Sequence, residues 1–188
     1  IQNLGWGKVN PKSLSHDWMI VRSAFNPMEW LHAAEKNSVA KLFNLVSPHP
    51  IHYAQLNRAI QTYKKMGRDI DWVRLRKGRS IRPGDQDKRL IGIRHNLEIL
   101  KYFKSKKDDV PDLYDDRFVA AMREFQKNHG LEDDGVIGNT TIQMLNLSPK
   151  DRVSMLEVNL ERWRWMPRNM GQRYLWVNIP DYDLHLID

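Results

Sequence analysis

The side chains that could act on or bind a ligand are scattered along this chain rather than grouped as a catalytic motif. The 188 residues include seven histidines and no cysteine, so disulfides, thiolate metal sites and a cysteine nucleophile are excluded within them. His49 and His52 are three apart but separated by Pro50, and the remaining histidines are isolated in the sequence. We therefore expect no metal site, no cofactor and no catalytic residue in these 188 positions.

Polar residues at predicted helix ends and turns are better candidates for binding. Asp133 and Asp134 adjoin Gly135, a pattern typical of a turn rather than of paired carboxylates for acid and base catalysis. We expect four residues to line the edge of a cleft between helices and to contact a ligand: Tyr114, Asp134, Asn139 and Thr140.

The elements that must position these residues are clearest over residues 114–147. Phe118, Met122 and Phe125 recur at spacings of four and three, which predicts one apolar stripe on a helix. Gly130 follows and can adopt the left-handed conformation that ends a helix, with Leu131 folding back on the stripe.

A second short helix is predicted after the turn at Asp134 and Gly135. Asn139 or Thr140 can cap this helix, and its apolar residues Ile142 and Leu145 are expected to face inward.

Helical spacing recurs elsewhere. It predicts one or two helices from Pro27 until residues 47–50, a helix over 52–66 ended by Gly67, a helix capped by Asp85 that continues to about Phe103, and a helix that begins with Ser148 and Pro149. Residues 174–179 and 182–187 alternate as strands do. The fold is therefore predicted to be mainly α.

The net charge of +7 is concentrated in residues 64–94, where eleven basic residues oppose four acidic ones. Such a strip could attract phosphates, acidic lipids or a carboxylate-bearing polymer, although an unevenly charged solvated surface has the same composition. No run approaches the roughly 18 apolar residues of a membrane span, so we expect none.

Two stretches, residues 82–100 and 113–146, resemble the small three-helix peptidoglycan-binding domain of bacterial cell-wall enzymes. The residues that carry this resemblance are Asp85, Leu90, Leu97, Tyr114, Ala121, Phe125, Gln126, Gly130, Leu131, Asp134, Gly135, Gly138, Thr141 and Leu145. The resemblance implies that peptidoglycan, through its stem peptides or its glycan, is the ligand of the four candidate residues.

The flanking sequence resembles a more specific family, the large periplasmic L,D-transpeptidases. NLERWRWMP at residues 159–167, followed by RYLWVNIP, is similar to the segment that leads from the binding module into their catalytic domain. HYAQLNRAIQTYKKM and WVRL, at residues 52–66 and 72–75, are similar to their helical scaffold. Within NLERWRW, Trp163, Arg164 and Trp165 are expected to pack where scaffold and catalytic domain meet rather than to form a platform for sugars.

The resemblance implies a helical scaffold with an inserted three-helix domain and the first strands of a truncated β domain. Residues 1–77 would be the first part of the scaffold, 78–147 the peptidoglycan-binding-like domain, 148–172 a scaffold helix that returns to the first part, and 173–188 the start of the catalytic β domain. Because two strands in isolation are marginally stable in water, we expect most of that domain to lie beyond Asp188.

The implied function is that of a non-catalytic scaffold and wall-binding portion. The family cross-links stem peptides through a cysteine in a Ser-His-Gly-Cys type motif, and this chain has no cysteine, so the parent protein is expected to be an enzyme and this chain is not. The implied location is the periplasm or cell envelope, with other cell-wall synthesis proteins as further partners and no nucleic acid. Two alternatives stay open: a stand-alone wall-binding adaptor, and a nucleic-acid-binding module that uses residues 64–94.

Overall fold

The computed structural model describes residues 2–16, 18–20, 24–47, 51–66, 71–167, 171–179 and 182–187. The fold is mainly α, as predicted, and its strands form one two-stranded sheet within the described residues. The chain divides into two compact units, Ile1–Arg58 with Leu156–Asp188, and Ala59–Met155. The predicted helix stops at residues 48–50 and at Gly67 lie outside the described residues.

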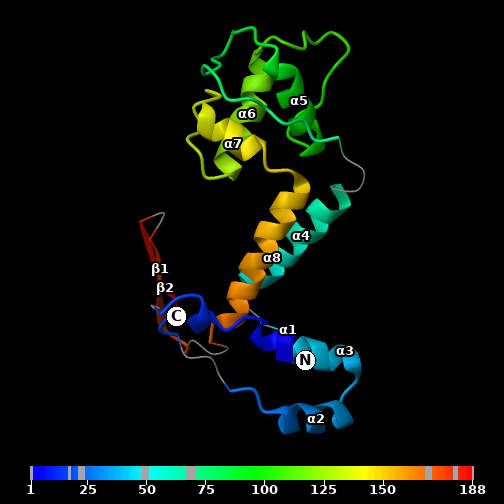
Figure 1. The fold of residues 1–188 in the computed structure, drawn as a ribbon, viewed down its shortest axis with the longest axis vertical. Helices are drawn as coiled ribbons and strands as arrows, with labels where there is room; N and C mark the ends of the chain where they lie inside the picture. The colour runs from blue at the N-terminus through cyan, green and yellow to red at the C-terminus, as the bar shows by residue number, and fades with distance from the viewer. Residues whose placement is uncertain are drawn as a thin grey trace. The chain divides into compact units, whose positions relative to one another are not determined.

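The first unit contains short helices, the beginning of α4, the end of α8 and a hairpin (Figure 1). The elements concerned are α1 Gln2–Trp6, the 3-10 helix Pro11–Ser13, α2 Pro27–Lys36, α3 Val39–Val46, α4 Ile51–Met66, α8 Pro149–Trp165, β1 Tyr174–Asn178 and β2 Asp183–Ile187. Asn26 caps α2, since its Oδ1 accepts a hydrogen bond from the Met28 amide at 3.1 Å. The predicted helical stretch after Pro27 is thus two helices.

The last turn of α8 holds the amino-terminal residues of this unit in place. Arg164 donates from Nε to the Leu4 carbonyl at 3.1 Å and from Nη2 to the Tyr53 hydroxyl at 3.1 Å. Glu161 accepts from the Val9 amide at 2.9 Å. Residues at the two ends of the sequence therefore share one set of hydrogen bonds.

The hairpin at the end of the chain confirms the two predicted strands. β1 and β2 pair antiparallel with Trp176 opposite His185. Trp176 stacks on Trp163 of α8 with ring centroids 5.7 Å apart and planes 13° apart, an arrangement that adds dispersion to the burial of both indoles.

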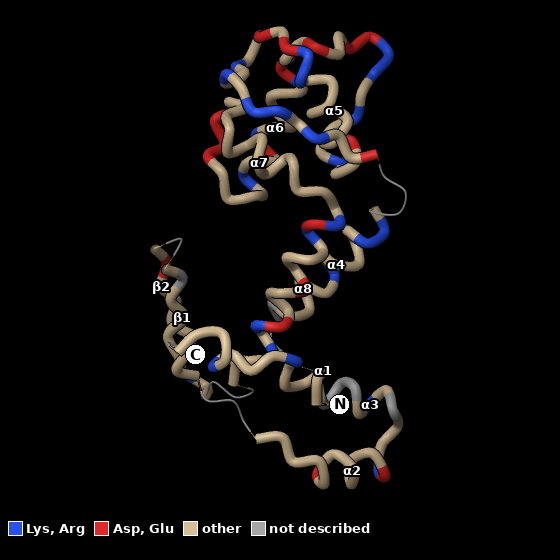
Figure 2. The backbone as a smooth tube through the Cα atoms, viewed as in Figure 1, with Lys and Arg blue, Asp and Glu red and all other residues tan. Residues whose placement is uncertain are grey.

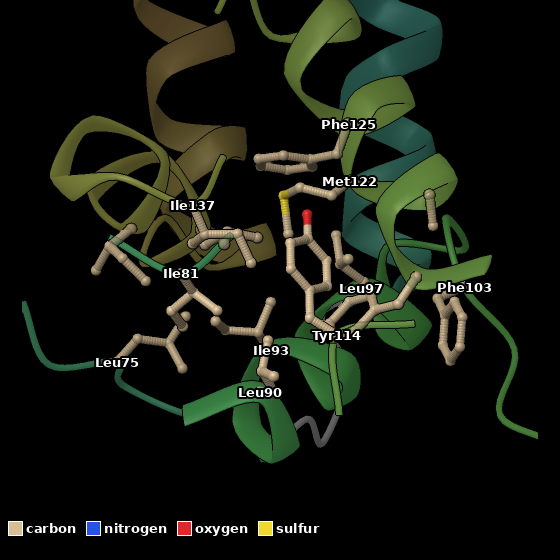
Figure 3. Close-up of a cluster of buried hydrophobic side chains, with 14 of the residues drawn as sticks. Leu75, Ile81, Leu90, Ile93, Leu97, Phe103, Tyr114, Met122, Phe125 and Ile137 are labelled. Atoms are coloured by element: carbon tan, nitrogen blue, oxygen red, sulfur yellow. The ribbon is translucent and has the colours of Figure 1, made fainter. Parts of the chain in front are cut away.

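The second unit has its own hydrophobic core, built mainly by α5 Arg89–Ile99, α6 Asp116–Asn128 and α7 Asn139–Leu145 (Figure 3). The predicted stripe Phe118, Met122 and Phe125 is fully buried, and Ile142 and Leu145 face inward as expected. Close packing of this kind explains why helical spacing identified the core residues.

The end of α6 also follows the sequence prediction. Gly130 is left-handed with φ of +66°, and the Leu131 amide donates to the Gln126 carbonyl at 2.9 Å. This bond closes the helix while Leu131 packs against the core. At the start of α8, Ser148 and Asp151 form a reciprocal cap, with Ser148 Oγ accepting from the Asp151 amide at 3.2 Å and Asp151 accepting from the Ser148 amide at 3.0 Å.

Two predicted caps are wrong. Asp85 does not cap α5: its Oδ2 accepts from the Arg82 amide at 2.8 Å and closes a turn. The carboxylate that accepts from the first amide of α5 is Asp87, at 2.8 Å from the nitrogen of Arg89. The helix begins later than the spacing suggested, because Gly84 with φ of +86° continues the turn.

The second wrong cap concerns α7. Its N-cap is Gly138, which is extended and offers no side-chain hydrogen bond. Asn139 and Thr140 are the first two helical residues instead. The cause is the isolated antiparallel bridge between Ile81 and Ile137, which holds the preceding backbone extended until the residue before α7.

No helix in the described ranges has both the length and the apolar character needed to cross a membrane.

Candidate functional site

Tyr114, the first predicted site residue, is buried rather than displayed on the surface. Its ring lies in the core (Figure 3), edge-on to Phe118 with ring centroids 5.2 Å apart, and the residue is 1% exposed. Its hydroxyl donates to the Gly135 carbonyl at 2.6 Å. Burial, together with the negative charge of Asp134, raises the pKa of the Tyr114 phenol well above its usual value. The Tyr114 hydroxyl is therefore neutral, and its hydrogen bond to the Gly135 carbonyl attaches the turn at residues 134–137 to the core.

The turn that Tyr114 supports is fixed by a second buried polar residue, Gln126. Gln126 is 1% exposed, accepts from the Gly135 amide at 2.9 Å and donates to the Val136 carbonyl at 3.0 Å. Asp134 accepts from the Val136 amide at 2.8 Å through Oδ1 while its side chain stays exposed. The turn prediction is confirmed, and it brings Tyr114 and Asp134 together.

The other two predicted site residues, Asn139 and Thr140, are exposed at the start of α7. They follow the turn by a few residues, after the extended segment that contains Ile137. Within the described part of the chain, neither side chain caps α7, whose N-cap is Gly138. The candidate site therefore combines a hydrogen-bonded turn at Asp134 with an exposed polar pair at Asn139 and Thr140.

An extended segment, residues 71–82, is linked to this site by the bridge between Ile81 and Ile137. Its residues 72–75 resemble a helical scaffold in sequence, but they are extended and pack against the core of the second unit. Two asparagine side chains hold this segment, and each one hydrogen-bonds to both the amide and the carbonyl of a single residue in it. Asn96 accepts from the Val73 amide at 3.1 Å and donates to its carbonyl at 2.8 Å. Asn146 does the same with Leu75 at 2.7 and 2.9 Å. The signal in the sequence was a polar residue, Asn96, on an apolar helix face, because a buried amide requires partners.

The described part of the predicted basic strip contains both exposed and buried cations. Figure 2 shows Lys and Arg along much of the extended segment before α5, and these side chains are exposed. Arg94, by contrast, is 4% exposed and donates to Asp115 at 2.8 Å. Arg89 is paired with Asp87 at 2.7 Å. Two cations of the predicted strip, Arg89 and Arg94, therefore form ion pairs within the protein.

The residues of the WRW sequence pack within the first unit. Trp165 is buried, meets Trp18 edge-on with ring centroids 5.4 Å apart, and donates from its indole nitrogen to Glu161 at 3.2 Å. Trp163 stacks on Trp176. Neighbouring residues on a helix point in different directions, and here they contact different partners.

Comparison with known protein families gives two matches. Residues 87–145 match the model of a putative peptidoglycan binding domain, which contains all four predicted site residues. Residues 1–60 match the model of a scaffold domain. No curated protein matches the chain significantly. The first match supports peptidoglycan binding by the segment that builds the second unit's core, and the second is consistent with the amino-terminal region expected of an L,D-transpeptidase.

Proposed function

We propose that this chain is the non-catalytic scaffold and peptidoglycan-binding portion of a bacterial L,D-transpeptidase, an enzyme that cross-links stem peptides during cell-wall biogenesis. The observation that carries the proposal is the presence, in one chain, of a peptidoglycan-binding match at 87–145 and a scaffold match at 1–60. The resemblance of residues 159–167 and of the RYLWVNIP segment to the family adds a third, independent stretch.

In this proposal residues 78–147 are the binding domain, inserted between the two parts of a scaffold at 1–77 and 148–172. The division of the chain supports the split scaffold, because Leu156–Asp188 belongs to the same compact unit as Ile1–Arg58. The hydrogen bonds of Arg164 to Leu4 and Tyr53 supply the physical link. Residues 173–188 would begin the catalytic β domain.

The proposed ligand contacts come from Asp134, Asn139 and Thr140, which are exposed. An amide such as that of Asn139 both donates and accepts, and so can pair with the peptide groups of a stem peptide or the acetamido groups of the glycan. Tyr114 contributes by positioning, since its hydroxyl bond to Gly135 keeps the turn next to Asp134 in one conformation. Binding to a preformed surface needs less ordering than binding to a mobile one.

The proposal assigns the chemistry to the parent enzyme. Acyl transfer through a cysteine needs a thiolate nucleophile, and this chain has no cysteine. The periplasm or cell envelope is the proposed location, because that is where peptidoglycan lies. Other cell-wall synthesis proteins are proposed as further partners.

Co-sedimentation with purified peptidoglycan tests the binding surface. The double variant N139A/T140A removes two polar side chains, each capable of a hydrogen bond worth about 1 kcal/mol, so the apparent affinity should fall about thirtyfold. The matched control is Gln143→Ala, a polar residue exposed on the same helix, which should bind as the native chain does. Equal binding by N139A/T140A and the native chain would contradict the assignment.

The coding sequence that follows Asp188 tests the enzymatic part of the proposal. A cysteine preceded by a histidine and a glycine is expected there. A stop codon would contradict the transpeptidase assignment and favour a stand-alone wall-binding adaptor.

A further inference from the structure

Four exposed cations follow one another along the segment before α5. They are Arg76, Lys77, Arg79 and Arg82, and we name them the basic ledge. Across the described ranges, none of the four side chains forms an ion pair. With Asp85 as the single acidic residue, positions 76–85 carry a net charge of +3 (four positive, one negative). Because all four side chains are exposed and unpaired with any carboxylate of the described residues, their charge is available to an anionic partner.

The backbone beneath the basic ledge is held in one conformation. Arg89 donates from Nη2 to the Arg79 carbonyl at 2.7 Å, and its own charge is neutralised by Asp87. Ile81 donates to and accepts from Ile137 at 3.2 and 3.0 Å. Hydrogen bonds therefore hold the ledge at two points, so its cations project from a fixed base.

The same bridge brings the ledge beside the polar pair of α7. Because Ile81 and Ile137 are antiparallel partners, Ser80 lies next to Gly138. A Cβ placed on Gly138 would be 4.0 Å from Ser80 Oγ. Asn139 and Thr140 follow Gly138 directly, and both are exposed.

We infer that the basic ledge and the Asn139–Thr140 pair form one surface that binds the free carboxylates of peptidoglycan stem peptides. This inference rests on the proposed peptidoglycan-binding function and identifies which part of the polymer is recognised. A guanidinium binds a carboxylate through two parallel hydrogen bonds, and arginine supplies three of the four ledge cations. Asn139 and Thr140 pair with the amide groups of the same peptide. The N-acetylated sugars are uncharged and give the ledge cations no ionic partner.

Sedimentation with two forms of purified peptidoglycan tests this assignment. One form is untreated, and in the other the stem carboxylates are converted to amides by carbodiimide and ammonia. The ledge variant is R76Q/K77Q/R79Q/R82Q, and the matched control is K101Q/K104Q/K106Q/K107Q, which removes the same number of exposed charges from the 101–107 segment. Far-ultraviolet circular dichroism verifies that both variants are folded.

The ledge variant should bind untreated peptidoglycan about tenfold more weakly than the native chain, while the control variant changes less than about threefold. The native chain should bind the amidated form about tenfold more weakly than the untreated form, whereas the ledge variant should bind both forms with nearly the same affinity. Equal losses of affinity in the ledge variant and the control variant would overturn the inference, because the net charge of the chain, rather than the position of the ledge cations, would then account for binding. Undiminished native binding to the amidated form would overturn it as well.

These failures differ from failure of the proposed function. If the native chain binds both forms equally, peptidoglycan binding stands and the carboxylate inference falls. If the native chain sediments with neither form, both fall. Ledge-dependent binding to duplex DNA with a steep salt dependence, without peptidoglycan binding, would assign the ledge to nucleic acid and overturn both proposals.

Discussion

Replacement of Asp115 by asparagine should destabilise the second unit through the buried cation Arg94. One Asp115 oxygen accepts from Arg94 Nη2 at 2.8 Å, and the other caps α6 by accepting from the Phe118 amide at 2.8 Å. Asparagine keeps a capping oxygen but loses the charge. Arg94 would then retain the Leu113 carbonyl at 2.6 Å and Asp109 at 3.7 Å.

The expected cost follows from how little Arg94 is exposed. Its side chain is 5% exposed, and its Nε and Nη1 atoms have no hydrogen-bond partner among the described residues. A hydrogen bond between charged groups contributes about 1.5–3 kcal/mol. Because Asp115 is 28% exposed, solvent screens part of this, and we expect Asp115→Asn to cost about 2 kcal/mol. Asp115→Ala also removes the cap, which adds about 1 kcal/mol.

Native-state hydrogen exchange of the α6 core amides is the suitable assay, since it reports opening of this unit separately from the other. A loss of about 2 kcal/mol accelerates exchange about thirtyfold, and a loss of about 3 kcal/mol accelerates it more than a hundredfold. Asp116→Asn is the matched control, because this neighbouring carboxylate is exposed in the same first turn; its macrodipole contribution should not exceed about 0.5 kcal/mol. Equal exchange rates in Asp115→Asn and Asp116→Asn would refute the reasoning.

The same substitution has a defined pH dependence. Burial raises the pKa of the Asp115 carboxyl, but the hydrogen bonds from Arg94 and the Phe118 amide, with the charges of Arg94 and Arg117, lower it below the usual value overall. A carboxyl with a lowered folded-state pKa stabilises the fold above its unfolded pKa and loses this effect as the pH falls through the folded value. The stability difference between the native chain and Asp115→Asn should therefore be constant above about pH 5 and shrink below about pH 4.

Three further substitutions test the site and its surroundings. Gly135→Ala should cost about 1–3 kcal/mol, because the residue has φ of +79° and a Cβ there would lie 3.1 Å from Arg123 Nε; exchange of the α6 amides measures the loss. Tyr114→Phe should cost about 1–2 kcal/mol in the same assay, because the Gly135 carbonyl loses its buried donor. Trp163→Ala should remove the near-ultraviolet circular dichroism signal of the stacked Trp163–Trp176 pair and lower the free energy of unfolding by about 1 kcal/mol or more.

Each of these three predictions has its own contrary result. Gly130 also has a positive φ but open space around its Cβ position, so Gly135→Ala should be the more harmful of the two alanine substitutions, and the reverse order would contradict the steric argument. Native-like exchange in Tyr114→Phe would contradict the positioning role of the hydroxyl. An unchanged near-ultraviolet spectrum in Trp163→Ala would contradict the stacking.

Local rules predicted the core of the second unit well. The stripe Phe118, Met122 and Phe125 and the left-handed Gly130 depend on residues within one helix and its end, so periodicity and glycine chemistry suffice. The roles of Asp85 and Asp87 were less predictable, because both aspartates lie near the start of α5 and either could cap it. The turn at Gly84 engages Asp85 with the Arg82 amide and leaves Asp87 to accept from the first amide of the helix.

Tertiary hydrogen bonds account for what the sequence could not reveal. Asn96 and Asn146 pair with backbone far from them in the sequence, at Val73 and Leu75. Tyr114 was predicted at the edge of a cleft, but a tyrosine ring with one polar atom can lie in a core as well as at an edge. The Gly135 carbonyl allows the core position, because it accepts the hydrogen bond that the buried hydroxyl requires. The predicted basic strip likewise failed to distinguish buried Arg94 from the exposed ledge cations.

The most direct test of the central proposal is co-sedimentation of the native chain with purified peptidoglycan, beside an insoluble uncharged polysaccharide such as cellulose. The proposal predicts saturable binding to peptidoglycan, none to cellulose, and binding by N139A/T140A that is about thirtyfold weaker, while Gln143→Ala binds normally. A native chain that stays in the supernatant with peptidoglycan, or that sediments equally with cellulose, would contradict it.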